Sequence, residues 1–124
     1  MKYIIMCGGN YDKWETPRQM IRIRDEPVVA RTIRLLRDYG VDDIAISTED
    51  SRFAQFGVPL LHCPNNFVSE RGIVKRGSWV EAFCLMAEPA CYIMGDVVFS
   101  PAAIQVIVNT ETDGIQFFAS CPPF

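Results

Sequence analysis

Short apolar runs alternate with segments of helical periodicity along this chain, and this alternation constrains the fold more than any other feature. The segment 2–7, "KYIIMC", is almost entirely apolar and ends at Gly8 and Gly9, which is typical of a strand buried on both faces of a parallel sheet. After a polar loop, an acidic start, Pro27 and a glycine stop at Gly40 predict a helix. The chain therefore begins with a strand, a loop and a helix.

The rest of the chain continues this alternation. We expect further strands at 43–48, 59–63, 91–96 and 115–120, a helical turn at 51–56, and helices at 77–87 and 101–109. The pattern predicts an α/β fold with an open, mostly parallel sheet and helices on both faces, which is a Rossmann-like arrangement. Ligands of such sheets bind beyond the carboxyl ends of the strands, where this chain has Gly8 and Gly9, residues 47–50, Gly95 and Asp96.

Length and composition limit the class of protein. The 124 residues, 49% of them hydrophobic, fit a single domain over residues 1–124. With 12 Lys and Arg against 15 Asp and Glu, the net charge of −3 does not favour a nucleic-acid partner. Five scattered cysteines predict reduced thiols, and no apolar stretch approaches the roughly 20 residues of a membrane span, so we expect a cytoplasmic protein without a membrane partner.

The loop after the first strand carries groups that suit phosphate. It is neither the dinucleotide fingerprint, because "CGGNYD" lacks the third glycine, nor a loop that ends in Gly-Lys-Ser/Thr. Glycines allow a backbone to approach a ligand closely, and Lys13 and Arg18 in the same loop can neutralise phosphate oxygens. The loop therefore predicts nucleotide binding of another kind.

Over nearly its whole length the sequence resembles the sugar-phosphate nucleotidyltransferases, which have a GT-A-like α/β fold. The resemblance rests on "MCGG", then Lys13, "PRQMIRI" and "DEPVVARTIRLLRDYGVDDIAI" in the family's order, followed by "KRGSWVEAF" and "YIMGDVVFS". Tyr11 stands where the family usually has glycine, Lys13 where it has arginine, and Arg18 where it has lysine. The exchange keeps both charges but changes their geometry, because arginine is a planar fork and lysine a point charge.

The resemblance implies both a reaction and a set of site residues. A phosphate oxygen of an acceptor, such as a sugar 1-phosphate, would attack the α-phosphorus of a nucleoside triphosphate and release pyrophosphate. By this resemblance Gly8, Gly9, Lys13 and Arg18 hold the phosphates, Gly77 and Ser78 approach the base, and Asp96 binds Mg²⁺. Arg18, Lys13 and Asp96 are then the catalytic residues, and Gly8, Gly9, Gly77 and Ser78 bind the nucleotide.

The resemblance covers the nucleotide-binding half of the family's domain. A second aspartate of the metal site and much of the acceptor pocket lie later in the family, whereas this chain stops at "CPPF". We therefore expect a domain that binds nucleotide but turns it over poorly or not at all. We also expect the sheet edge after 115–120 to expose apolar surface and to favour a homo-oligomer.

Each of these residues also has a simpler interpretation. Gly8 and Gly9 can form an ordinary strand-ending turn, Asp96 can be a loop acid or a helix cap, and the basic residues of 71–76 can be a solvated loop. Cys7 is expected to be a small buried hydrophobe, and His62 to have a structural role. We expect Trp14 and Trp79 to contribute buried area.

Two other functions stay open beside nucleotidyl transfer. One is a nucleotide-binding module without turnover, because the acceptor half is missing. The other is a dinucleotide domain of the dehydrogenase type, against which the absent fingerprint and the long charged loop both count.

Overall fold

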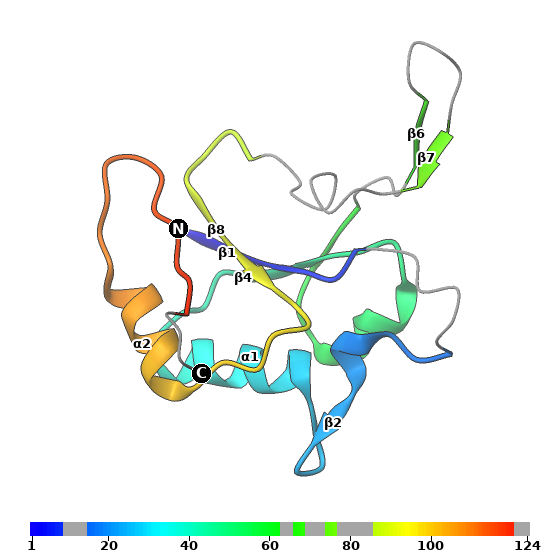
Figure 1. Ribbon diagram of the computed structural model, residues 1–124, viewed down its shortest axis with the longest axis horizontal. Coiled ribbons are helices and arrows are strands. Elements are labelled where there is room, and N and C mark those ends of the chain that lie inside the picture. Colours follow the sequence, from blue (N-terminus) through cyan, green and yellow to red (C-terminus); the bar gives the residue numbers. More distant parts are fainter. Residues whose placement is uncertain (9–14, 63–65, 69–73, 77–85, 121–124) are drawn as a thin grey trace.

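The computed structural model describes residues 1–8, 15–62, 66–68, 74–76 and 86–120 (Figure 1). Its helices and strands are, in chain order, β1 Lys2–Met6, η1 Arg18–Met20, β2 Arg22–Ile23, β3 Glu26–Pro27, α1 Val28–Asp38, β4 Ile44–Ser47, η2 Ser51–Phe56, β5 Leu60–Leu61, β6 Asn66–Val68, β7 Val74–Arg76, β8 Ala90–Met94 and α2 Pro101–Asn109; η marks a 3₁₀ helix.

A four-stranded parallel sheet organises the described residues. Its strand order is β5-β4-β1-β8, and each neighbouring pair is parallel, with Ile4 opposite Ala45 on one side and opposite Tyr92 on the other. Each strand was predicted, and each is shorter than its predicted range. The predicted α/β class with a mostly parallel sheet is confirmed.

The core lies between the sheet and the two α-helices. In β1 every residue from Tyr3 to Met6 is buried, which confirms the prediction of a strand covered on both faces. One face of β1 packs against Val29, Ile33 and Leu36 of α1, the apolar stripe that the helical spacing predicted. Figure 1 shows α1 and α2 together on one side of the sheet.

Helix α1 ends as the sequence predicts. Gly40 has φ +84°, a left-handed conformation that glycine adopts without the steric cost that a Cβ imposes. The amide of Gly40 donates to the carbonyl of Arg37, and the amide of Val41 donates to that of Leu36. The chain is thereby turned back toward β4.

Helix α2 begins at a side-chain cap. The amide of Ala103 donates to Oγ of Ser100 at 3.1 Å, and Pro101 occupies the first turn, where its missing N–H costs nothing. The helix has the bounds that the sequence predicted, and Ile104 is its fully buried residue.

The strand predicted at 115–120 is wrong. These residues have no regular structure, and Ile115 and Phe117 are each 85% exposed. An apolar run becomes a strand only when a sheet edge pairs with its backbone, and no described strand pairs with this segment. The sequence predicted self-association through a sheet edge formed at 115–120. This segment is not a strand, so it forms no such edge.

Two small hairpins were not predicted as such. Strands β2 and β3 pair through a turn at Arg24 and Asp25, whose φ values of 50° and 63° are unusual for residues with a side chain. Strands β6 and β7 form the second hairpin, which includes Lys75 and Arg76 of the basic segment. Of the predicted helix at 77–87, residues 77–85 lie outside the described part, and Met86 and Ala87 are not helical.

Candidate functional site

The carboxyl ends of β1 and β8 lie at the point where the strand order of the sheet reverses. From β1 the sequence moves outward through β4 to β5, and then returns to place β8 on the other side of β1. Such a reversal is the usual ligand position in an open parallel sheet, because the loops that leave the two strands diverge there. Gly8 follows β1 at this point, and Asp96 follows β8.

Gly95 allows the two strand ends to approach each other closely. Its amide donates to the carbonyl of Met6 at 3.0 Å, which extends the β1–β8 pairing by one residue. A Cβ at this position would lie 2.6 Å from Sγ of Cys7, 2.6 Å from the Met6 carbonyl oxygen and 3.1 Å from Cγ of Gln19. A side chain does not fit here unless its neighbours move, so the position next to Asp96 requires glycine.

Arg18 and Asp96, which are far apart in the sequence, lie next to each other. Nη2 of Arg18 is 4.0 Å from Oδ2 of Asp96, with side-chain exposures of 51% and 27%. Asp96 is not the cap of the following helix, because Ser100 has that role. Two of the three predicted catalytic residues are therefore together at the carboxyl edge of the sheet, beside the strand end that Gly8 follows.

Cys7 is buried near Asp96 and is not suited to act as a nucleophile. It is 3% exposed, and burial together with the nearby Asp96 carboxylate raises the pKa of its thiol far above the ordinary value. Only the thiolate is a good nucleophile, so Cys7 stays an unreactive thiol at neutral pH. This confirms the interpretation of Cys7 as a small buried hydrophobe.

A group of side chains after β4 extends the same edge of the sheet. Oγ1 of Thr48 donates to the carbonyl of Cys7 at 3.1 Å, which ties the ends of β1 and β4 together.

Two further contacts lie along this edge. Oε2 of Glu49 lies 3.0 Å from Nε2 of His62, which follows β5 and is 84% exposed. Asp50 caps η2 by accepting from the amide of Arg52 at 2.9 Å. The sequence predicts that residues 47–50 follow a strand, but no local pattern predicts these contacts.

A family model for the MobA-like NTP transferase domain matches residues 3–119. The chain belongs to this family. The nucleotidyltransferase family that the sequence predicted is thereby confirmed. No curated protein matches the sequence significantly.

Among solved structures, this NTP transferase domain is similar to the crystal structure of Rv0371c from Mycobacterium tuberculosis H37Rv. The TM-score is 0.58 at 18% sequence identity, and the match covers 87% of this chain. At this identity the similarity supports the fold alone. The chain spans 58% of the length of that structure.

Asp96 could hold a divalent cation at the carboxyl edge of the sheet. Mg²⁺ is usually bound by one or two carboxylates, with substrate phosphates and water as its other ligands. Asp96 supplies one partly exposed carboxylate at the strand junction, and no group of three potential metal-ligating side chains occurs among the described residues. The residues present therefore suit a cation that arrives with a phosphate ligand better than one enclosed by the protein.

Four of the predicted site residues lie outside the described part of the chain. They are Gly9, Lys13, Gly77 and Ser78, and Trp14, Arg71 and Trp79 are outside it as well.

None of the helices in the described ranges has the length and apolar character of a membrane span.

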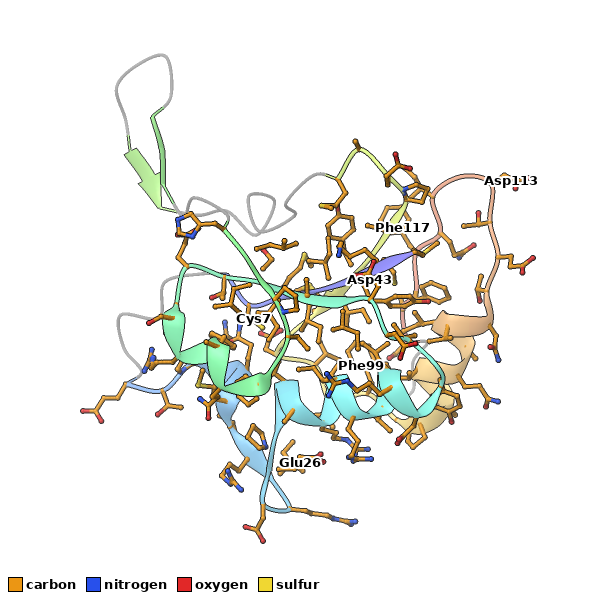
Figure 2. The ribbon with its side chains drawn as sticks, turned by 180° about the vertical axis from the view of Figure 1, so that it is seen from behind. Cys7, Glu26, Asp43, Phe99, Asp113 and Phe117 are labelled. Atoms are coloured by element: carbon orange, nitrogen blue, oxygen red, sulfur yellow. The ribbon has the colours of Figure 1, made fainter. Side chains whose placement is uncertain are left out.

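A hollow of about 520 Å³ lies at the opposite, amino edge of the sheet. It is lined by Met1, Lys2, Asp43, Met86, Glu88 and Pro89. Nζ of Lys2 donates to Oδ1 of Asp43 at 2.6 Å, so the two charges nearest the strands neutralise each other. Figure 2 shows Cys7 and Asp43 toward opposite ends of the strands. This hollow is therefore separate from the junction that holds Arg18 and Asp96.

Proposed function

We propose that the domain binds a nucleoside triphosphate with its phosphates at the carboxyl ends of β1 and β8. The observation that carries this proposal is the position of Arg18 and Asp96, which places a guanidinium and a carboxylate together at the reversal point of the sheet. A guanidinium matches phosphate oxygens, and a carboxylate matches the cation that accompanies a triphosphate. The family match over residues 3–119 supports the same ligand class.

The proposed reaction is nucleotidyl transfer to a sugar 1-phosphate or a similar phosphate ester, with release of pyrophosphate. Gly8, Gly9, Lys13 and Arg18 would hold the phosphates, Gly77 and Ser78 would approach the base, and Asp96 would hold Mg²⁺. The bound cation would neutralise charge on the phosphates. The protein's own task is to position the reactants and to stabilise developing charge, as is general for transfers at phosphorus.

Nucleotide binding without turnover is the second candidate function. It is favoured by the lack of any group of three potential metal-ligating side chains in the described part of the chain, since the charge on a transferring group would then be only partly stabilised. We also propose a cytoplasmic location and self-association through exposed apolar surface.

Two measurements on the purified chain test these proposals. A thermal-shift screen of the common nucleoside triphosphates with Mg²⁺ should raise the unfolding temperature for at least one of them, because a ligand of the native state stabilises it by mass action. No response to any triphosphate would contradict the binding proposal. Pyrophosphate release should then be followed with a panel of sugar 1-phosphates: acceptor-dependent release supports transfer, and its absence beside clear binding supports the second candidate.

A further inference from the structure

Two pairs of consecutive residues meet beside the junction of β1 and β8. Arg18 and Gln19 are consecutive in η1, and Gly95 and Asp96 are consecutive after β8. Gln19 is 1% exposed and packs against Gly95, close to the place that a Cβ would occupy. This buried contact packs η1 against the segment that follows β8, and the neighbouring side chains of Arg18 and Asp96 lie close to each other.

The ion pair itself is weakly held. Its 4.0 Å separation is long for a direct hydrogen-bonded pair, and both side chains reach solvent. Ion pairs of this kind contribute little free energy, since water and salt screen them. A ligand that offers each partner a stronger contact can therefore replace the pair at little cost.

We propose that Asp96 exchanges Arg18 for the divalent cation when the triphosphate binds, so that the ion pair couples cation binding to nucleotide binding. This inference rests on the proposed function. Without ligand, Arg18 neutralises the carboxylate that would hold the cation, and Asp96 neutralises the guanidinium that would hold phosphate. The ion pair therefore weakens the binding of a cation alone to Asp96 and of a phosphate alone to Arg18. A cation–triphosphate complex offers a partner to both side chains at the same time.

The exchange predicts that removing Arg18 changes two affinities in opposite directions. In Arg18→Gln, which keeps much of the side-chain stem, the affinity for bare Mn²⁺ or Mg²⁺ should rise about two- to fivefold, as expected on loss of an exposed ion pair. The affinity for the Mg²⁺–triphosphate complex should fall at least about tenfold, because a charge-assisted phosphate contact is lost. A role for Arg18 in folding alone would not raise one affinity while it lowers the other.

Removal of Asp96 gives the complementary result. In Asp96→Asn, the affinity for the triphosphate in EDTA should rise about two- to fivefold, because Arg18 is released and one negative charge is gone. The gain in triphosphate affinity on adding Mg²⁺ should disappear. In the double variant Arg18→Gln/Asp96→Asn, the changes in binding free energy should not be the sum of those in the single variants. Each single substitution already removes the same ion pair.

Arg37→Gln is the matched control. Arg37 is exposed in the last turn of α1, so the substitution makes the same change in net charge at a distance from Asp96. Bare-cation affinity, measured by calorimetry or by the electron paramagnetic resonance signal of free Mn²⁺, should be unchanged in this variant. Circular dichroism and thermal unfolding establish that each variant is folded.

The outcomes separate this inference from the function on which it rests. If the wild-type chain binds no triphosphate with Mg²⁺, the proposed function fails and the exchange fails with it. If it binds the complex, but Arg18→Gln leaves bare-cation affinity unchanged or lowers it, only the exchange is overturned. Equal gains in Arg18→Gln and Arg37→Gln would also overturn it, because the effect would then be one of net charge.

Discussion

Substitution of Gly95 by alanine should destabilise the junction that carries Asp96. The new Cβ would meet Sγ of Cys7 and the carbonyl oxygen of Met6, each at 2.6 Å, and the second of these is backbone and cannot rotate away. Overpacking of this kind costs about 1–3 kcal/mol, and weakening of the bond from the Gly95 amide to Met6 adds about 1 kcal/mol. Alanine also has less conformational entropy than glycine in the unfolded chain, which offsets about 0.4–1 kcal/mol of this destabilisation. The free energy of unfolding should therefore fall by about 1–3 kcal/mol.

Urea denaturation followed by circular dichroism measures this change, and Gly114→Ala is its control. A Cβ at Gly114 would meet nothing within 4 Å, so that variant should be as stable as the wild type or slightly more stable. Cys7→Ala in the Gly95→Ala background should recover part of the loss, because it removes the Sγ contact and leaves the Met6 contact. A Gly95→Ala variant with wild-type stability would refute the close packing of the two strand ends.

Three further predictions concern the loop, a turn and a cap. Lys13→Ala should lower triphosphate affinity at least about tenfold while nucleoside affinity stays unchanged in calorimetry, because only a phosphate contact is lost; equal losses would indicate misfolding instead. Replacing Arg24 and Asp25 by Asn-Gly should raise the free energy of unfolding in urea by about 1 kcal/mol, since both positions have positive φ, and unchanged stability would contradict this. The hydrogen bond from the Arg52 side chain lowers the pKa of Asp50 below its ordinary value of 3.8. Ionised Asp50 therefore stabilises the folded state above pH 3.8, and this stabilisation is lost as the pH falls through the lower pKa of the folded state. Asp50→Asn should therefore have a smaller loss of stability on acidification than the wild type, and identical pH profiles would contradict it.

The sequence predicted those elements whose signal is local. Strand β1 was predictable because it is apolar throughout, and α1 because its apolar positions recur at helical spacing before a glycine stop. The segment 115–120 has the same apolar signal as a strand, yet it has no partner in the described sheet. Pairing is a property of two distant segments, so a single run of apolar residues does not determine it.

The site was predictable in its composition but not in its contacts. Gly8 and Asp96 were predicted from their positions after strands, Arg18 from its charge in the polar loop, and all three from the family resemblance. The structure places Arg18 beside Asp96. The steric need for Gly95 depends on Cys7 and Gln19, which come from other parts of the chain. The pairing of Glu49 with His62 likewise depends on the register of β4 and β5, which no local pattern encodes.

An amide-resolved NMR titration of the ¹⁵N-labelled chain with each triphosphate and Mg²⁺ tests the central claim most directly. The claim is that phosphates bind at the carboxyl ends of β1 and β8. The amide signals of Gly8, Gly95 and Asp96 should then shift with saturating dependence on ligand, while those of Lys2 and Asp43 at the amino edge stay in place. Shifts confined to the residues that line the amino-edge hollow, with Gly95 and Asp96 unmoved, would contradict the account.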